Sequence, residues 1–372
     1  MREGQVGKIE LVCLLCLCII SISVFGIPAQ ELYSNGNSSY ISLPLATLLA
    51  YGLFLLLENR IRSGGYINLD DMLKCTIGNF FAQLFKVFIA IQFIFAAALP
   101  LIQFMETMHS YIFDTSYVMI AFYITIPIVV LPWLGFESIA RTARIFAPLL
   151  LILSIIMMFI PLNSYQSYRM YPLLGDGVGD ISLRTSAFCG MLFLIMISLL
   201  YIPQCTHGTL YYRKAVSKAV LISIIIMASM EIAISMIYTS NQLMDIQLPF
   251  LNLNDIIPAE TYSIRFEKVT LFFLISGCFI SSGFSNYMAS NLLTKLFKQN
   301  DIRSFAFSCG FIASCIVLIA CITRDITIYN EKFVLYTRCI SLAITLLILI
   351  IASLIKKKGT NTEKRERAII NE

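Results

Sequence analysis

Ten long apolar stretches follow one another along this chain, and the charged residues lie almost entirely in the gaps between them. Hydrophobic residues make up 58% of the sequence and charged residues only 13%. A water-soluble domain has no means of burying so much apolar surface. Each stretch is close to the roughly 20 residues that a helix needs to cross the hydrocarbon core of a bilayer. The sequence therefore predicts an all-α membrane protein.

About ten transmembrane helices are expected, in one transporter-like domain over residues 1–355, with a basic cytoplasmic tail at residues 356–372. A short amphipathic helix at residues 69–77 is expected after the second span, with Asn68 as its N-cap and Gly78 beyond its end. The expected spans cover residues 9–33, 41–60, 80–108, 117–134, 145–161, 182–203, 216–239, 267–293, 304–323 and 333–355.

Lysine and arginine concentrate in alternate loops, and this asymmetry predicts which side of the membrane each loop occupies. The basic loops are expected to be cytoplasmic, which places both termini in the cytoplasm. An even number of spans leads to the same arrangement. The net charge of +5 is therefore a topology signal. The basic residues are scattered over separate loops without interleaved aromatic residues, so nucleic-acid binding is not expected.

Metal, cofactor and enzyme chemistry find little support in the residue types. The chain has 11 cysteines and 2 histidines, and the Cys-x-x-Cys pair at Cys13 and Cys16 does not recur. Cysteine acting as a small apolar residue is the better interpretation, so neither structural disulfides nor a bound metal or cofactor is expected. No His-Glu-x-x-His motif and no Ser–His pair at membrane depth are present, which predicts a protein that is not an enzyme.

The first apolar stretch contains residues that interrupt a helix near mid-membrane, namely Ser21, Ser23, Gly26 and Pro28. We expect an inner half-helix to about Ser21, an unwound segment, and an outer half-helix from Pro28. The free N–H groups at the start of the outer half-helix would suit an anion such as a carboxylate. A kinked helix without a ligand is the alternative interpretation.

Residues 185–190 in the sixth stretch also concentrate small and polar side chains, including Ser186 and Gly190 beside Phe188. We expect a second interruption there, five spans after the first. That spacing is typical of transporters built as a five-plus-five inverted repeat, whose substrates bind between two broken helices.

Other polar residues at membrane depth are candidates for binding or coupling. Gln92, midway along the third stretch, is expected to meet either a ligand or a neighbouring helix. Glu231, midway along the seventh stretch, suits either proton or cation coupling, gating, or a neutral structural hydrogen bond. Ser281, Ser282 and Asn286 form a polar stripe on the eighth stretch that suits either an ion site or close helix packing.

A series of short segments then carries a family resemblance. They are residues 21–28, Gly65 with Tyr66, residues 135–141, residues 171–177, residues 186–190 followed by Pro203, residues 248–250, and Arg265. In this order and spacing over ten spans, the chain resembles the B-subunit, or permease-like, family of bacterial spore germinant receptors, within the amino acid–polyamine–organocation superfamily.

The resemblance implies a multi-pass sensor in the inner membrane of a dormant spore. It implies a mid-membrane site for a small nutrient, commonly an amino acid, and partnership with an A-subunit and a lipoprotein C-subunit. The rival interpretation is an amino-acid or amine permease that transports its substrate. The expected ligand-binding residues are Ser21, Ser23, Gly26, Gln92, Ser186, Phe188 and Gly190. The expected coupling or ion-site residues are Glu231, Ser281, Ser282 and Asn286.

Overall fold

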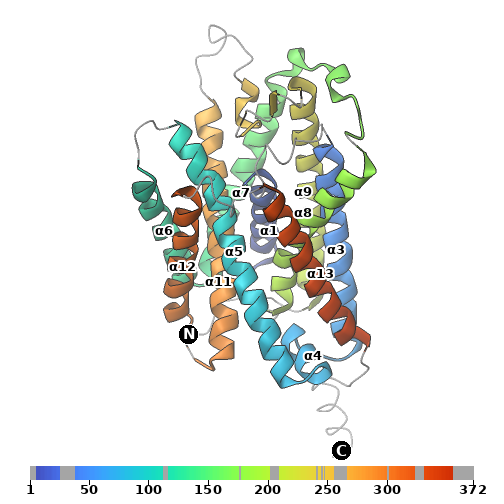
Figure 1. Ribbon diagram of the computed structural model, residues 1–372, viewed down its shortest axis with the longest axis vertical. Coiled ribbons are helices and arrows are strands. Elements are labelled where there is room, and N and C mark those ends of the chain that lie inside the picture. Colours follow the sequence, from blue (N-terminus) through green and yellow to red (C-terminus); the bar gives the residue numbers. More distant parts are fainter. Residues whose placement is uncertain are drawn as a thin grey trace, which may run out of the picture.

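The computed structural model describes residues 6–25, 38–111, 116–175, 177–201, 209–239, 242–243, 246, 248–254, 266–299, 301–322 and 331–354. These residues form a bundle of long helices (Figure 1). The long helices are α1 (Lys8–Phe25), α3 (Ser39–Ser63), α5 (Asn79–Tyr111), α6 (Tyr117–Leu134), α7 (Phe136–Phe159), α8 (Val178–Tyr201), α9 (Thr209–Ile237), α11 (Phe266–Leu296), α12 (Arg303–Ile322) and α13 (Glu331–Leu354). The shorter elements are α4 (Leu69–Thr76), η1 (Leu162–Ser164), η2 (Ser167–Met170) and η4 (Leu251–Asn254).

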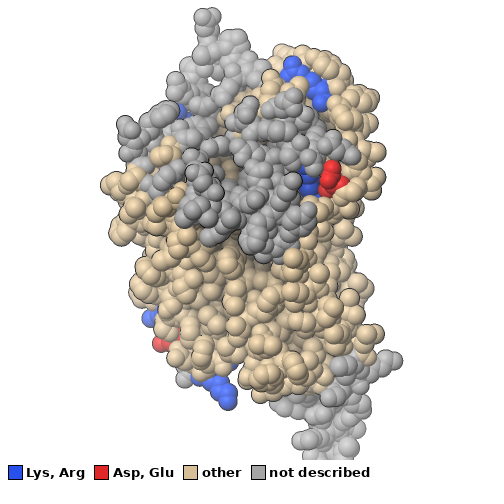
Figure 2. Space-filling view, in the orientation of Figure 1, with Lys and Arg blue, Asp and Glu red and all other residues tan. Residues whose placement is uncertain are grey.

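Most of the long helices are suited to crossing a bilayer. Within the described residues, 8 helices are long and apolar enough to do so, and two shorter apolar segments lie in α6 and α13. On the face shown in Figure 2, the coloured Lys, Arg, Asp and Glu residues lie toward the two ends, and a broad belt between them is uncharged. The chain is therefore a multi-pass membrane protein, and its many exposed Leu, Ile and Phe side chains are suited to a lipid surrounding.

The boundaries of α4 and α7 follow from local chemistry. The Asn68 side chain accepts a hydrogen bond of 2.9 Å from the Asp71 N–H, and Gly78 has φ +98°, which confirms the predicted N-cap and helix end. The predicted start of α7 at residue 145 is wrong. Gly135, with φ +96°, ends α6, and α7 begins at once, with Glu137 and Arg141 paired one turn apart. Its polar first turns belong to the helix rather than to a loop.

The packing of the helices reveals two related halves. In chain order, α1, α3, α5, α6 and α7 correspond to α8, α9, α11, α12 and α13. The packed pair α1–α9 in one half corresponds to the packed pair α3–α8. In the same way, α1–α7 corresponds to α8–α13, and α5–α12 corresponds to α6–α11. The pairs α5–α11, α6–α12 and α3–α9 each join corresponding helices. Exchange of the halves thus preserves the main contacts, as expected for a five-plus-five inverted repeat.

One set of contacts departs from this symmetry. Helix α11 packs closely against both α1 and α7. Its counterpart α5 packs only lightly against α8 and has no extensive contact with α13 among the described residues. The bundle is therefore looser where α5, α8 and α13 meet.

The end of the bundle that carries α4, at the bottom of Figure 1 and here called the α4 end, holds a buried ion pair. The Lys86 ammonium lies 2.6 Å from the Asp70 carboxylate, and Lys86 is only 3% exposed. Asp70 also pairs with Lys74 at 2.9 Å, within α4. The pair fixes α4 against the beginning of α5 and offsets the cost of burying the lysine.

Candidate functional site

A narrow cleft lies at the loosely packed junction of α5, α8 and α13. The space between its walls is about 210 Å³, part of which is open to the surroundings, and the cleft is too narrow to admit a water-sized sphere. A small solute therefore has to separate these helices or turn their side chains in order to enter. The cleft is lined by Ile89, Gln92, Gly190, Phe193, Leu194, Ile197, Leu342 and Thr345.

Gln92 and Gly190, both predicted as ligand-binding residues, are brought together in this cleft. The Gln92 Nε2 atom is buried and has no hydrogen-bond partner in the part of the chain that the structure describes. Thr345, across the cleft, donates its hydroxyl proton to the Ser341 and Leu342 carbonyls at 2.9 and 2.8 Å, so its oxygen still has lone pairs to accept a bond. The cleft is mainly apolar, with an unsatisfied amide donor on one wall.

The predicted interruption of the sixth span at residues 185–190 is wrong, because α8 is a continuous helix from Val178 to Tyr201. The small residues there serve packing instead. A methyl group on Gly190 would lie 3.1 Å from the Arg338 carbonyl oxygen and 3.3 Å from Leu342 Cβ, so glycine lets α13 approach α8 closely. Ser186 Oγ donates to the Leu183 carbonyl at 2.7 Å and lies 3.0 Å from Cys339 Sγ on α13.

Arg338 lies on the buried face of α13, four residues before Leu342 and seven before Thr345. The residue is 7% exposed. No hydrogen bond or ion pair engages its guanidinium group within the described residues, although its carbonyl faces Gly190. Arg338 was not singled out from the sequence. The available signal was its position five residues inside a predicted span, where an arginine is costly.

The other predicted ligand residues lie away from the cleft. Phe188 is 1% exposed in the core of the bundle and does not line the cleft. Ser21 and Ser23 belong to α1, which continues to Phe25, so the expected end of the inner half-helix at about Ser21 is wrong. The Ser23 hydroxyl donates to the Ile20 carbonyl at 2.7 Å, within the helix. Gly26, like Pro28, lies outside the described residues.

Ser21 is nevertheless at an informative position. It is fully buried, its hydroxyl oxygen has no partner within the described residues, and it lies against α11. A methyl group on Gly277 of α11 would come within 2.7 Å of this oxygen and 3.2 Å of Leu17 Cδ2. Gly277 thus permits the close approach of α1 and α11.

The predicted coupling residues occupy two separate places. On α9, Glu231 is 8% exposed and accepts a hydrogen bond of 2.6 Å from the Ser39 hydroxyl of α3. On α11, the Asn286 amide donates to the Ile128 carbonyl of α6 at 3.0 Å and to the Ala306 carbonyl of α12 at 3.1 Å. These bonds join three helices, as the packing interpretation of the stripe predicts.

Two serines of the same stripe differ in their bonding. The Ser281 hydroxyl donates to the Cys278 carbonyl at 3.0 Å, within α11. Ser282 is fully buried, and its hydroxyl oxygen has no partner in the described part of the chain. The stripe therefore lies in the helix-packing core rather than beside the α5–α8–α13 cleft.

Solved transporter structures share this fold. Mhp1, a nucleobase-cation-symport-1 family transporter in a closed conformation with bromovinylhydantoin bound, has a TM-score of 0.57 and 17% identity, over 93% of this chain and 78% of that chain. A Na⁺-coupled sialic acid symporter in a substrate-bound outward-open state has a TM-score of 0.60 and 12% identity, over 93% of this chain and 79% of that chain. Mhp1 in its inward-facing conformation has a TM-score of 0.52 and 12% identity, over 95% of this chain and 89% of that chain. At these identities, the likeness shows the fold alone.

Comparison with proteins of curated function gives no match. Comparison with family profiles gives a match over residues 5–327, which is most of the chain and extends from before α1 to beyond α12. The matched profile is that of the spore permeases, described as spore germination protein. The inverted-repeat fold and this match lead to one conclusion: the chain belongs to the spore germination protein family of permease-like membrane proteins.

Proposed function

We propose that this protein senses a small nutrient that bears an anionic group, and that the nutrient binds where α5, α8 and α13 meet. The observation that carries the proposal is Arg338, a residue only 7% exposed whose guanidinium group has no hydrogen-bond or ion-pair partner among the described residues. It lies on the face of α13 that continues into the cleft beside Gln92 and Gly190.

An unpaired buried cation is costly, and a permanently charged arginine cannot relieve this cost by losing its proton. A carboxylate would accept paired hydrogen bonds from the guanidinium group. The unsatisfied Gln92 amide, further along the cleft, offers another donor. Two unsatisfied donors in one region favour a ligand that is rich in acceptors.

An amino acid is the nutrient class that fits best. Its carboxylate would meet Arg338, and its ammonium group would find an acceptor in the hydroxyl oxygen of Thr345 or of Ser186, since each hydroxyl already donates its proton to a backbone carbonyl. The apolar wall formed by Phe193, Leu194 and Ile197 would select for the side chain.

Family membership supports the setting of this activity. We place the protein in the inner membrane of the spore, with the α4 end and both termini on the cytoplasmic side, as the distribution of basic loops predicts. Its partners are a germinant receptor A-subunit and a lipoprotein C-subunit. The tail at residues 356–372, predicted to be basic and cytoplasmic, lies outside the described residues.

A permease that transports its substrate is the second candidate, and the transporter fold favours it. The bond between Ser39 and Glu231 adds a buried carboxylate at the α3–α9 contact, a feature suited to proton coupling. Uptake of radiolabelled amino acids into proteoliposomes distinguishes the two functions. Saturable binding without uptake supports the sensor, whereas uptake that exceeds the bound amount supports the permease.

Thermal-shift titration of the purified chain with amino acids tests the proposed site. For any amino acid that stabilises the native protein, Arg338→Gln should weaken binding by about 10- to 100-fold, the cost of losing a hydrogen bond to a charged group. Arg338→Lys should recover part of the affinity, because it keeps the charge but loses the bidentate geometry. Equal affinity in native protein and Arg338→Gln would overturn the proposed site.

A further inference from the structure

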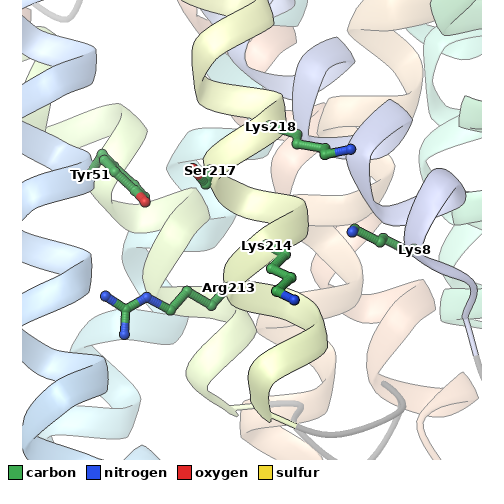
Figure 3. Close-up of a pocket in the computed structure, with 6 residues that line it drawn as sticks. All are labelled: Lys8, Tyr51, Arg213, Lys214, Ser217 and Lys218. Atoms are coloured by element: carbon green, nitrogen blue, oxygen red, sulfur yellow. The ribbon is translucent and has the colours of Figure 1, made fainter.

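A second hollow, distant from the cleft, lies at the α4 end of the bundle among α1, α3 and α9. It has a volume of about 450 Å³ and is lined by Lys8, Tyr51, Arg213, Lys214, Ser217 and Lys218 (Figure 3). Figure 3 shows the Lys8 side chain directed toward α9 and the Lys218 side chain directed toward α1. Four cationic side chains from two helices therefore surround one hollow.

The charges around this hollow are poorly neutralised by the protein. Arg213 has neighbours, with its Nε atom 3.6 Å from the Glu58 carboxylate and its Nη1 atom 3.4 Å from Asn59 Oδ1. The nearby acid Glu10 is engaged by Arg144 and by the Gly7 N–H. Within the described residues, none of the three lysines has a carboxylate at ion-pairing distance. Their mutual repulsion would be relieved by a bound anion.

The exposed face of α9 indicates what kind of anion. Lys214, Ser217 and Lys218 occupy its first exposed turns, and Leu221 and Ile225 continue the same face at helical spacing toward mid-membrane. These two apolar side chains are 62% and 59% exposed. The face is thus cationic at the level of the membrane surface and apolar immediately above it.

Helix α3, on the other side of the hollow, also changes from a polar to an apolar surface toward mid-membrane. Tyr51 lies 12 residues before the end of α3, about 18 Å along the axis from its α4 end. Leu48, one turn further into the membrane, is 53% exposed. The tyrosine hydroxyl adds a hydrogen-bond donor at the boundary between the cations and the apolar surface.

We propose that this hollow binds an anionic glycerophospholipid of the adjacent leaflet, with its phosphate among Lys8, Lys214 and Lys218. The acyl chains lie along Leu221, Ile225 and Leu48. The general excess of basic residues on one side of a membrane protein explains cations at this level. It does not explain their convergence on one hollow below a continuous apolar face, which matches the division of a lipid into headgroup and tails.

The test uses the full chain in nanodiscs of phosphatidylcholine with or without one quarter phosphatidylglycerol. Lipids retained after extraction are counted by native mass spectrometry, and the thermal midpoint is measured in each bilayer. We expect the native chain to retain phosphatidylglycerol and to unfold at a higher temperature in its presence. Lys214→Gln/Lys218→Gln should lower the retention constant by about 25-fold, at about fivefold for each lysine near the membrane surface.

The matched control is Arg141→Gln/Lys298→Gln, which removes the same charge from exposed positions outside the hollow. It should retain phosphatidylglycerol as the native chain does. The proposal would be overturned if the double lysine variant retained as much phosphatidylglycerol as the native chain. It would also be overturned if the control variant lost as much phosphatidylglycerol as the lysine variant. Glycerol 3-phosphate and inorganic phosphate form the last arm. A thermal shift with either as large as that with phosphatidylglycerol would show a soluble-anion site and overturn the lipid assignment.

Discussion

The two repeats use their third helices differently. Helix α11 lies tightly against α1 and α7, and Gly277 allows this approach by leaving room for Ser21 and Leu17. Its counterpart α5 meets α8 and α13 loosely, and the cleft with the unsatisfied Gln92 amide lies in that junction. Helices in lipid associate mainly through close packing of small residues. The same topology therefore gives a tightly packed core or a narrow cleft, according to the side chains at one contact.

The largest expected effect comes from crowding the tight contact. Gly277→Val should destabilise the protein by about 3 kcal/mol, because its first carbon would lie 2.7 Å from Ser21 Oγ. The thermal midpoint after detergent extraction measures this. Gly52→Val on α3 is the matched control, since nothing lies within 4 Å of the added carbon. Equal midpoints for the two variants would mean that the α1–α11 contact is no tighter than an open helix surface.

An intermediate effect is expected at the loose contact, with opposite signs for stability and binding. Gln92→Leu removes a buried donor without a described partner, so it should stabilise the empty protein by about 1 kcal/mol. It should also raise the nutrient concentration for half-maximal response up to about tenfold. Thermal unfolding and germination dose–response curves provide the two readouts. A loss of stability would indicate that the amide is bonded in the empty protein.

The smallest effect on stability is expected at the α3–α9 contact, which joins corresponding helices of the two repeats. Glu231→Gln keeps an oxygen that accepts the Ser39 hydroxyl proton, so the free energy of unfolding should change by less than about 0.5 kcal/mol. If the carboxylate couples to protons, the pH profile of germination or uptake should flatten while the protein accumulates normally. An unaltered profile would leave Glu231 with a structural role only.

Much of the fold could be predicted from the sequence, because membrane helices follow from the length and apolarity of each segment. The bounds of α6 and the cap of α4 at Asn68 were predicted correctly. The first turns of α7 were missed, because Glu137 and Arg141 resemble loop residues until their pairing along the helix is seen. Charge near a span end does not by itself distinguish a loop from a solvated helical turn.

The candidate site was harder to predict, because small residues have two opposite uses in membrane helices. Ser186 and Gly190 suggested an unwound segment. In α8, however, the Ser186 hydroxyl donates to a carbonyl of the same helix, and Gly190 allows α13 to approach closely. Gln92 was selected as a polar residue midway along its predicted span, and its place in the cleft could be known only from the arrangement of α8 and α13. Arg338 was overlooked because a sequence gives no direct measure of whether a long side chain reaches water or is buried among neighbouring helices.

The buried pair of Lys86 and Asp70 has a consequence for the order in which the protein is made. Only 16 positions separate the two residues. The opposite charges of Asp70 on α4 and Lys86 on α5 can therefore pair as soon as both helices have left the ribosome. The Glu231 carboxylate, in contrast, accepts a hydrogen bond from Ser39, which lies 192 residues earlier and must already be inserted. We expect the lysine-bearing span to enter the membrane as a local hairpin-like unit, independently of the second repeat.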